Sequence, residues 1–350
     1  MDGRYFAVLA LAAALHRSQG HWVDFWLDNR RVYGHFSAPL SPWAQLDFDV
    51  ELSAHLLFRL QVDRAREHLR QRRPITWPLD DPLAASDLLA LPSDVSYRDR
   101  LSLDEVYLIN LPRRRDRLAL MEYALHVYGI DARLVEAVDG GAMSSSLLRR
   151  LLNLTQLAGY RDPFTGRTMT RGEVGCLLSH YGVWSELVAS ASLQRVLVLE
   201  DDVDLVPGFR THLISALAEA DRLQPRWDLV YLGRRRMAPK SESESEWPQA
   251  EQPLRGAHLL LRPGYSYWTL AYLLSRRGAQ KLLAAQPLQH MLPVDEFLSV
   301  MFDRHPNADW RRQFATRDLD VLAVDPVIVQ PLFTRQDAEY HSDTEASDLF

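Results

Sequence analysis

The chain has 350 residues, of which 47% are hydrophobic and 25% charged, and its formal net charge is −6. These proportions are ordinary for a soluble globular protein, and the acidic balance excludes the broad basic surface typical of nucleic-acid-binding proteins. The sequence contains one cysteine, Cys176. An intrachain disulfide and a zinc site built from several thiolates are therefore excluded. The length is enough for two domains, or for one large domain with an appendage.

The N-terminal residues allow two interpretations. An apolar stretch from Phe6 to Leu15 follows an early arginine, as in a short signal peptide. The alternative is an ordinary buried helix, because Asp2 offsets the charge of Arg4 and no clear cleavage site follows. No stretch reaches the roughly 20 apolar residues of a membrane-spanning helix, so we expect no membrane span.

Residues 1–95 read as a mixed segment. The stretch "HWVDFWL" resembles a strand, and "FDVELSAHLLFRLQVDRAREHLRQRR" has the apolar spacing of a helix. The following "PITWPLDDPLAASDLLALPSD" contains four prolines and reads as a linker. We therefore expect a domain boundary near residue 95.

Beyond the boundary, strands and helices alternate. "EVYLINL" predicts a strand that ends at Asn110, "RRRDRLALMEYALHVYGI" an amphipathic helix, and "ARLVEAVDG" a second strand that ends at Asp139 and Gly140. "TRGEVGCLLSHYGVWSELVAS" predicts another helix, while "RVLVLEDDVDL" and "WDLVYLGRRR" predict two further strands. This alternation is typical of a parallel α/β sheet.

An acidic triplet ends one of these strands. Four aliphatic residues precede Glu200, Asp201 and Asp202. Ligands of open α/β sheets bind beyond the carboxyl ends of the strands, and carboxylates gathered there suit a hard cation such as Mg²⁺ or Mn²⁺ with a diphosphate. The alternative is a solvated turn that caps a helix, and the triplet alone does not distinguish the two.

Other strand and helix ends carry candidate groups with ordinary alternatives. In "NLPRRRDR", guanidiniums at a strand end could meet phosphate or the acidic triplet. Glu173, Cys176 and His180 share one helix face, either as part of a site or as a helix cap followed by a buried histidine. Asp295 and Glu296 begin a helix, either as charges that complement its dipole or with a general base among them.

Several stretches together resemble the procollagen galactosyltransferases of glycosyltransferase family 25. They are "DEVYLINLPRRRDRLALM", "RLVEAVDG", "GYRDPFTGRTMTRGEVGCLLSHYGVW", "VLVLEDDVDL", "WDLVYLGRRRM", "YSYWTLAYLLSRRGAQKLLAAQPLQHMLPVDEFLSVMFDRHPN" and "SDTEAS". The resemblance runs from about residue 104 to 346. We therefore expect residues 96–346 to form the family domain, and residues 1–95 to be the remnant of a preceding glycosyltransferase-like domain plus a linker.

The resemblance implies a GT-A-type fold, with a Rossmann-like, mostly parallel sheet and flanking helices after a partial N-terminal α/β segment. It implies UDP-galactose as donor, Mn²⁺ or Mg²⁺ as cofactor, and hydroxylysine of collagen or procollagen as acceptor in the endoplasmic reticulum lumen. The sugar would be transferred with inversion, which calls for a base on the acceptor hydroxyl. No nucleic acid partner is expected. A homodimer is compatible with the sequence, which does not determine the oligomeric state.

Site residues carry over from the family by position. Asp202 resembles the acid that contacts the metal directly, and Glu200 and Asp201 would share the metal or face the ribose. Asp295 is the first candidate for the base and Glu296 the second. The residues that resemble the family's donor-binding positions are Asn110, Leu111, Arg117, Asp139, Gly140, Ser179 and His180.

Two departures from the family pattern, and the variety of the family's members, keep other functions open. Phe333 stands where the family usually has a late histidine, which helps to bind metal in many GT-A enzymes. The family's C-terminal RDEL-type retention signal has no counterpart, although Asn153 begins a glycosylation sequon. The family also includes a relative regarded as inactive and linked to cell adhesion, and bacterial members that build lipo-oligosaccharide. A non-catalytic binding role, or another donor or acceptor, therefore stays an alternative.

Overall fold

The computed structural model describes residues 23–27, 30–34, 98–142, 144, 146, 154–237, 251–332, 343–344 and 349–350. The helices and linker expected within residues 1–95 lie outside this part of the chain, as do Asn153 and Phe333. Two N-terminal strands are described. The predicted strand β1 (Val23–Leu27) is confirmed and pairs antiparallel with β2 (Arg30–Gly34), which the sequence pattern did not predict.

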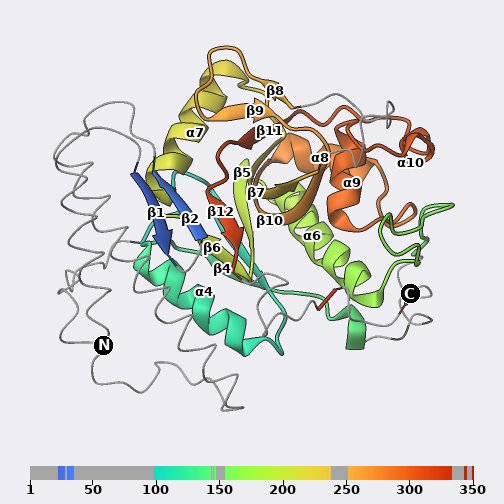
Figure 1. The fold of residues 1–350 in the computed structure, drawn as a ribbon. Coiled ribbons are helices and arrows are strands. Elements are labelled where there is room, and N and C mark those ends of the chain that lie inside the picture. The colour runs from blue at the N-terminus through green and yellow to red at the C-terminus, as the bar shows by residue number, and fades with distance from the viewer. Residues whose placement is uncertain are drawn as a thin grey trace.

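A sheet of eight strands forms the centre of the described fold, in the order β4-β3-β5-β10-β7-β11-β9-β8 (Figure 1). The strands are β3 (Glu105–Asn110), β4 (Arg133–Glu136), β5 (Arg195–Glu200), β7 (Leu229–Arg236), β8 (Gln252–Pro253), β9 (Leu260–Arg262), β10 (Ser266–Ser275) and β11 (Val321–Val324). A separate pair joins β6 (Val203–Leu205) to β12 (Val329–Pro331). The predicted strand–helix–strand unit is confirmed, because β3 and β4 are parallel neighbours.

The expectation of a mostly parallel sheet needs correction, because the sheet is mixed. β3 is parallel to β4 and β5, and β7 is parallel to β11. β10 lies between β5 and β7 and runs antiparallel to both. The alternation of strands and helices stops at β7, and the described residues between β7 and β10 contain strands but no helix. β10 therefore runs back along β7 in the opposite direction, as strands joined without a helical crossover do.

Helices cover both faces of the sheet (Figure 1). They are α4 (Arg115–Val127), α6 (Arg171–Ala189), α7 (Phe209–Leu223), α8 (Arg276–Ala284), α9 (Val294–Met301) and α10 (Ala308–Arg312), with a short 3₁₀ turn at Gly140–Ala142. Along β5, Val196 and Val198 join the core under α6, α8 and α9, while Leu197 and Leu199 join the core under α4 and α7. Burial on both faces explains why β5 reads as a continuous aliphatic run.

Local chemistry fixes where α6 begins. The Thr170 hydroxyl accepts the amide of Glu173 at 3.0 Å, and the Glu173 carboxylate accepts the amide of Thr170 at 2.8 Å. This is a reciprocal capping box. Arg167 donates to both carboxylate oxygens of Glu173, each at 2.8 Å. Of the two interpretations of Glu173, the structure supports the helix cap.

None of the helices in the described part of the chain combines the length and the hydrophobicity that a membrane span requires.

Replacing Gly175 on α6 with alanine should destabilise the protein by about 1–3 kcal/mol. An added Cβ would lie 2.4 Å from the carbonyl oxygen of Val138 and 2.7 Å from the amide nitrogen of Gly140, which are backbone atoms with little room to move. Gly182 on the same helix is the matched control, because no atom lies within 4 Å of its added Cβ. Gly182→Ala should be neutral or stabilising by up to about 1 kcal/mol. Urea unfolding of both variants tests this, and equal stabilities would contradict it.

Candidate active site

The acidic triplet begins at Glu200, the last residue of β5, and its two aspartates are held by side chains from β3 and α4. Asn110, the last residue of β3, donates its side-chain amide to Asp201 over 2.7 Å. Arg117 on α4 places Nη1 3.0 Å from a carboxylate oxygen of Asp201 and 3.0 Å from one of Asp202. Arg117 and Asp201 are only 8% and 7% exposed. The protein's own guanidinium therefore offsets part of the repulsion within the triplet.

A further acid, Asp343, joins this network from the C-terminal part of the chain. Its carboxylate forms ion pairs with Arg113 and Arg114. Among the described residues, ion pairs link three guanidiniums to five carboxylates: Arg113, Arg114 and Arg117 with Asp116, Asp139, Asp201, Asp202 and Asp343. Glu200, next to Asp201 in the chain, adds a sixth carboxylate. The excess of negative charge is what a bound cation would balance.

Glu200 is oriented by a chain of hydrogen bonds through the core. The indole of Trp184 donates to the hydroxyl of Tyr272 at 3.0 Å, and that hydroxyl lies 2.8 Å from Nδ1 of His180. Nε2 of His180 is 3.3 Å from Oε1 of Glu200, which also accepts the hydroxyl of Thr269. Every hydrogen finds a partner if Tyr272 donates to Nδ1 and the Nε2–H of His180 donates to Glu200. The alternative of a buried, hydrogen-bonded histidine is thus confirmed, but its partner is an acid of the triplet.

The acids of the triplet differ in how readily they ionise. Burial opposes ionisation of Glu200, but the hydrogen bonds from His180 and Thr269 and the positive charge of Arg117 outweigh it and hold its pKa below the ordinary value. Burial raises the pKa of Asp202 to about 7; Arg117 opposes this rise, while Asp201 and Glu200 add to it. Asp202 is thus the acid that most lacks a compensating positive charge.

The two acids at the start of α9, Asp295 and Glu296, have different surroundings. Glu296 is 1% exposed and accepts hydrogen bonds from the hydroxyls of Tyr265 at 2.8 Å and of Tyr267. Nε2 of His305 lies 2.7 Å from the same carboxylate. Three partners hold Glu296 in place, so it has little capacity left to act on a substrate.

Asp295 is held much more loosely. One carboxylate oxygen accepts the amide of Glu296 at 2.9 Å, and the other accepts the amide of Trp268 at 3.3 Å. Burial raises the pKa of Asp295 to about 8, and the charge of Glu296 adds to the rise. A carboxylate with so high a pKa takes up a proton readily, which is the property that a general base needs.

Strand β10 brings the two acidic groups together. Thr269 donates to Glu200 at the end of β5, and the preceding residue, Trp268, donates its amide to Asp295 on α9. Successive Cα atoms are about 3.8 Å apart, so the contacts to the two acids start from neighbouring residues. The triplet and Asp295 therefore border one site.

Two predicted donor-binding residues lie beside the acidic network. The carbonyl oxygen of Leu111 accepts the amide of Arg114 at 2.8 Å, in the turn between β3 and α4. Asp139, beyond the end of β4, is half-buried and pairs with Nε of Arg113 at 2.8 Å. Both are therefore near Asn110 and Arg117 at the carboxyl edge of the sheet. That they bind the donor stays a prediction.

Ser179 and Gly140 join the end of β4 to α6. Ser179 donates to the carbonyl oxygen of Gly175 at 2.7 Å and accepts the amide of Val138 at 2.9 Å. A Cβ on Gly140 would lie 1.8 Å from the carbonyl oxygen of Arg171. Gly140 was expected among the donor-binding residues, but the backbone that lies against it in the structure is that of helix α6.

Two sets of side chains are candidates for holding a metal. Within the described residues, one group of three offers ligand atoms within 4.8 Å of one another: Cys176, His180 and Glu200. Burial raises the pKa of the Cys176 thiol well above its ordinary value, and a sulfur ligand suits zinc rather than Mn²⁺ or Mg²⁺. Glu200 and Asp202 offer oxygen atoms, with side chains 25% and 28% exposed. This carboxylate pair fits a hard cation.

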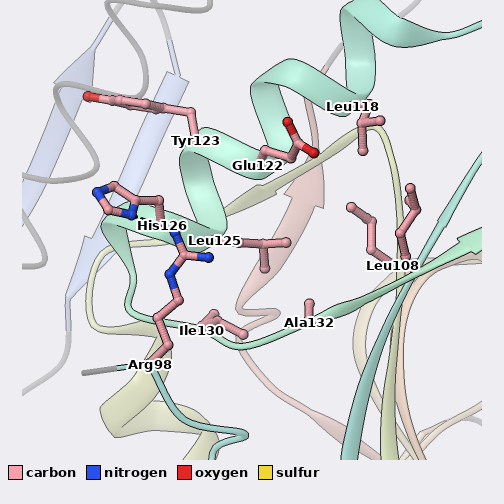
Figure 2. A pocket seen from close by; sticks show the side chains of 10 residues that line it. Arg98, Leu108, Leu118, Glu122, Tyr123, Leu125, His126, Ile130 and Ala132 are labelled. Carbon is pink, nitrogen blue, oxygen red and sulfur yellow. Dashed lines mark hydrogen bonds between the residues drawn. The ribbon is translucent and has the colours of Figure 1, made fainter. Parts of the chain in front are cut away.

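The pocket drawn in Figure 2 lies elsewhere, between α4 and strands β3 and β4. It encloses about 470 Å³ and is lined mainly by apolar side chains such as Leu108 and Ile130. At one end Arg98 and His126 approach each other, with 2.7 Å between Nη2 and Nδ1. No predicted site residue lines it.

Comparison with known proteins identifies the family. Residues 103–298, more than half of the chain, match the sequence model of "Glycosyltransferase family 25 (LPS biosynthesis protein)". The chain belongs to glycosyltransferase family 25. The resemblance noted in the sequence is thereby confirmed, and membership implies a sugar-nucleotide donor.

Members of family 25 with similar sequence identity to this chain carry names that differ in the activity they state. Human "Procollagen galactosyltransferase 2" is 38% identical over 328 residues, which cover 94% of this chain and 48% of that protein. Human "Inactive glycosyltransferase 25 family member 3" is 40% identical over 329 residues, covering 94% and 50%. "Procollagen galactosyltransferase 1-B" of Xenopus laevis is 38% identical over 328 residues, covering 94% and 49%. The chain spans about half the length of these relatives.

Several residues around the candidate site were not singled out from the sequence. They are Thr269, Tyr265, Tyr267, His305 and Asp343. All lie inside the stretches that resemble the family, "YSYWT", "DRHPN" and "SDTEAS". Their hydrogen-bond and ion-pair partners are far away in the chain. The stretches therefore indicated the family, but they did not show what each residue contacts.

Replacing Arg117 with methionine should destabilise the protein by about 3–5 kcal/mol, because it leaves buried carboxylates without their cation. The loss should be largest above about pH 7 and smaller at lower pH, where Asp202, whose pKa is already about 7, can take up a proton instead. Arg115, exposed on the same helix, is the matched control, and Arg115→Met should have little effect. Denaturant unfolding at several pH values measures both, and equal stability of the two variants would contradict the prediction.

Proposed function

We propose that this chain transfers galactose from UDP-galactose to the hydroxyl group of hydroxylysine in collagen, with a divalent cation and with inversion at the sugar. The observation that carries the proposal is that two neighbouring residues of β10 contact two acids whose pKa values are shifted in opposite directions. Thr269 holds Glu200 of the acidic triplet, and Trp268 holds Asp295. A transferase needs a charged site for the departing diphosphate and a base for the acceptor side by side.

The donor half would be a GT-A-type nucleotide-sugar site at the carboxyl ends of β3, β4 and β5. Asp202 and Glu200 would hold Mn²⁺ or Mg²⁺, since they are the partly exposed oxygen ligands of an over-charged cluster. When bound, the cation supplies positive charge that stabilises the departing UDP. Asn110 and Arg117 fix Asp201, which keeps the end of β5 rigid under the donor.

The acceptor half would depend on Asp295. In an inverting transfer, the acceptor oxygen bonds to the anomeric carbon as the bond from that carbon to the UDP oxygen breaks, and the acceptor proton passes to a base. Asp295 suits this role because its pKa, raised to about 8 by burial and by Glu296, makes it a strong base for a carboxylate. Glu296, held by Tyr265, Tyr267 and His305, would keep the first turn of α9 in position.

Galactose and collagen enter the proposal through the relatives. Proteins named procollagen galactosyltransferases from Homo sapiens, Mus musculus and Xenopus laevis align with 94% of this chain. We propose the endoplasmic reticulum lumen as the place of action, as the family resemblance implies. We also propose that residues 96–346 form the transferase domain and that residues 1–95 derive from a preceding domain.

The second candidate is a family 25 protein that binds without transferring sugar. It is favoured by the 40% identity to "Inactive glycosyltransferase 25 family member 3" and by Phe333, which cannot ligate a metal as a late histidine would. Such a protein would leave UDP-galactose unconsumed in the presence of acceptor. Transfer of labelled galactose to a hydroxylysine peptide separates the two candidates.

Asp202→Asn should lower metal-dependent transfer from labelled UDP-galactose by at least about 100-fold, because the cation loses its best ligand and with it several kcal/mol of charge stabilisation. The variant should remain folded, since it removes a negative charge from a crowded cluster. Asp309→Asn, on an exposed side chain of α10, is the control and should transfer normally. Full activity of Asp202→Asn, or wild-type product formed in the presence of chelator, would contradict the metal role.

The value of kcat/KM should rise with pH and level off above about pH 8, because Asp295 must lose its proton before it can accept one from the acceptor. Asp295→Asn should lower kcat/KM by about 10²–10⁴-fold and flatten this rise. The measurement is a pH profile at saturating Mn²⁺. A variant that keeps the wild-type profile would assign the base elsewhere.

A further inference from the structure

Trp268 combines two features that packing does not explain. Its φ is 68°, and it is the one aromatic among the described non-glycine residues with positive φ. This backbone conformation costs roughly 1–2 kcal/mol and is a genuine outlier for a bulky side chain. Burial of the ring would offset the cost, but Trp268 is 38% exposed. A strained and exposed tryptophan points to a functional role rather than a structural one.

The strain has a local origin in β10. The pairing of β10 with β7 shifts register between Tyr267 and Ala271, as at a β-bulge. Bulges re-aim side chains and are frequent beside active sites. The same bend directs the amide of Trp268 to Asp295 at 3.3 Å. The backbone of Trp268 therefore contacts the proposed base directly, and its exposed indole ring belongs to the residue that makes this contact.

The ring is held from one side by a cation. The guanidinium carbon of Arg235 lies 5.5 Å from the centroid of the Trp268 ring. Such a contact restricts the rotation of an exposed ring. A pre-positioned aromatic surface loses little conformational entropy when it binds a partner.

A second exposed aromatic, Phe164, is linked through Tyr267 to the other acid of the pair. Phe164 is 55% exposed and sits in a turn where Asp162 accepts the amides of Phe164 at 3.0 Å and Thr165 at 2.7 Å. Its ring packs edge-on against Tyr267, with 5.5 Å between centroids. Tyr267 in turn donates to Glu296. The turn thus presents an exposed ring from an ordered position beside the acids.

We propose that Trp268 and Phe164 form an acceptor-binding surface for an extended, proline-rich peptide in the polyproline II conformation. The proposal rests on the proposed function, because it places the acceptor chain where its hydroxyl group reaches Asp295. Polyproline II segments bind exposed aromatic side chains, since their preformed backbone loses little entropy and their proline rings pack on flat rings. A single strand of Gly-X-Y triplets has this conformation. Arg235, beside the indole, suits the unpaired carbonyl groups of such a strand.

The test is the affinity of a peptide of Gly-X-Y triplets with a central hydroxylysine, short enough to stay single-stranded, for protein saturated with UDP and Mn²⁺. Trp268→Ala should weaken binding by about tenfold or more, as loss of an anchoring tryptophan does, and Phe164→Ala should weaken it as well. Ile214→Ala is the control, because Ile214 is 47% exposed on α7, against the other face of the sheet. UDP affinity should be the same in all variants, and thermal unfolding should show that each is folded.

Unchanged peptide affinity in Trp268→Ala would overturn the proposal. Wild-type protein that binds UDP but not the peptide would overturn it as well. If wild-type protein binds no UDP, the proposed donor site fails. The peptide titration without UDP then still tests this surface, and its dependence on Trp268 decides the outcome.

Discussion

The site depends on one antiparallel strand inserted between two parallel parts of the sheet. β10 separates β5 from β7, and its irregular stretch meets both acidic groups through Trp268 and Thr269. Tyr267, in the same strand, donates to Glu296. Were β10 regular here, backbone hydrogen bonds to β7 would occupy the amides that this stretch turns outward. The irregular pairing therefore gives up sheet hydrogen bonds in order to position carboxylates at the start of α9 and the end of β5.

Charge balance explains how the fold tolerates such a site. Arg117 and Asn110 stabilise Asp201, and hydrogen bonds from His180 orient Glu200, so the end of β5 is rigid. The compensation is incomplete, since carboxylates outnumber guanidiniums in the network. A site that balanced all its charge internally would have little affinity for a cation. The incomplete balance accompanies a raised pKa of Asp202, and the metal-bound diphosphate that we propose would supply the missing positive charge.

Much of the local structure could be predicted from the sequence. Strands ending at Asn110 and at Glu200 were expected from their apolar runs, and the helix that follows Thr170 was expected from its periodicity. The acidic triplet and the pair Asp295 and Glu296 became candidate site residues through the family resemblance, since each pattern alone also allowed an ordinary structural role. The predictions of strands and helices succeed because spacing along the chain reports directly on which side chains face the core.

The sequence by itself thus determined the elements and the acids at their ends, together with the family. Only the tertiary structure decided that β10 runs antiparallel, that Asp343 meets Arg113 from 230 positions away, and that Glu296 is locked while Asp295 stays open. Two adjacent acids with similar side chains cannot be told apart by pattern, since the difference lies in the hydroxyl and amide groups that surround them. Those groups come from distant segments. Their positions follow from how the sheet is assembled, and no local periodicity encodes that assembly.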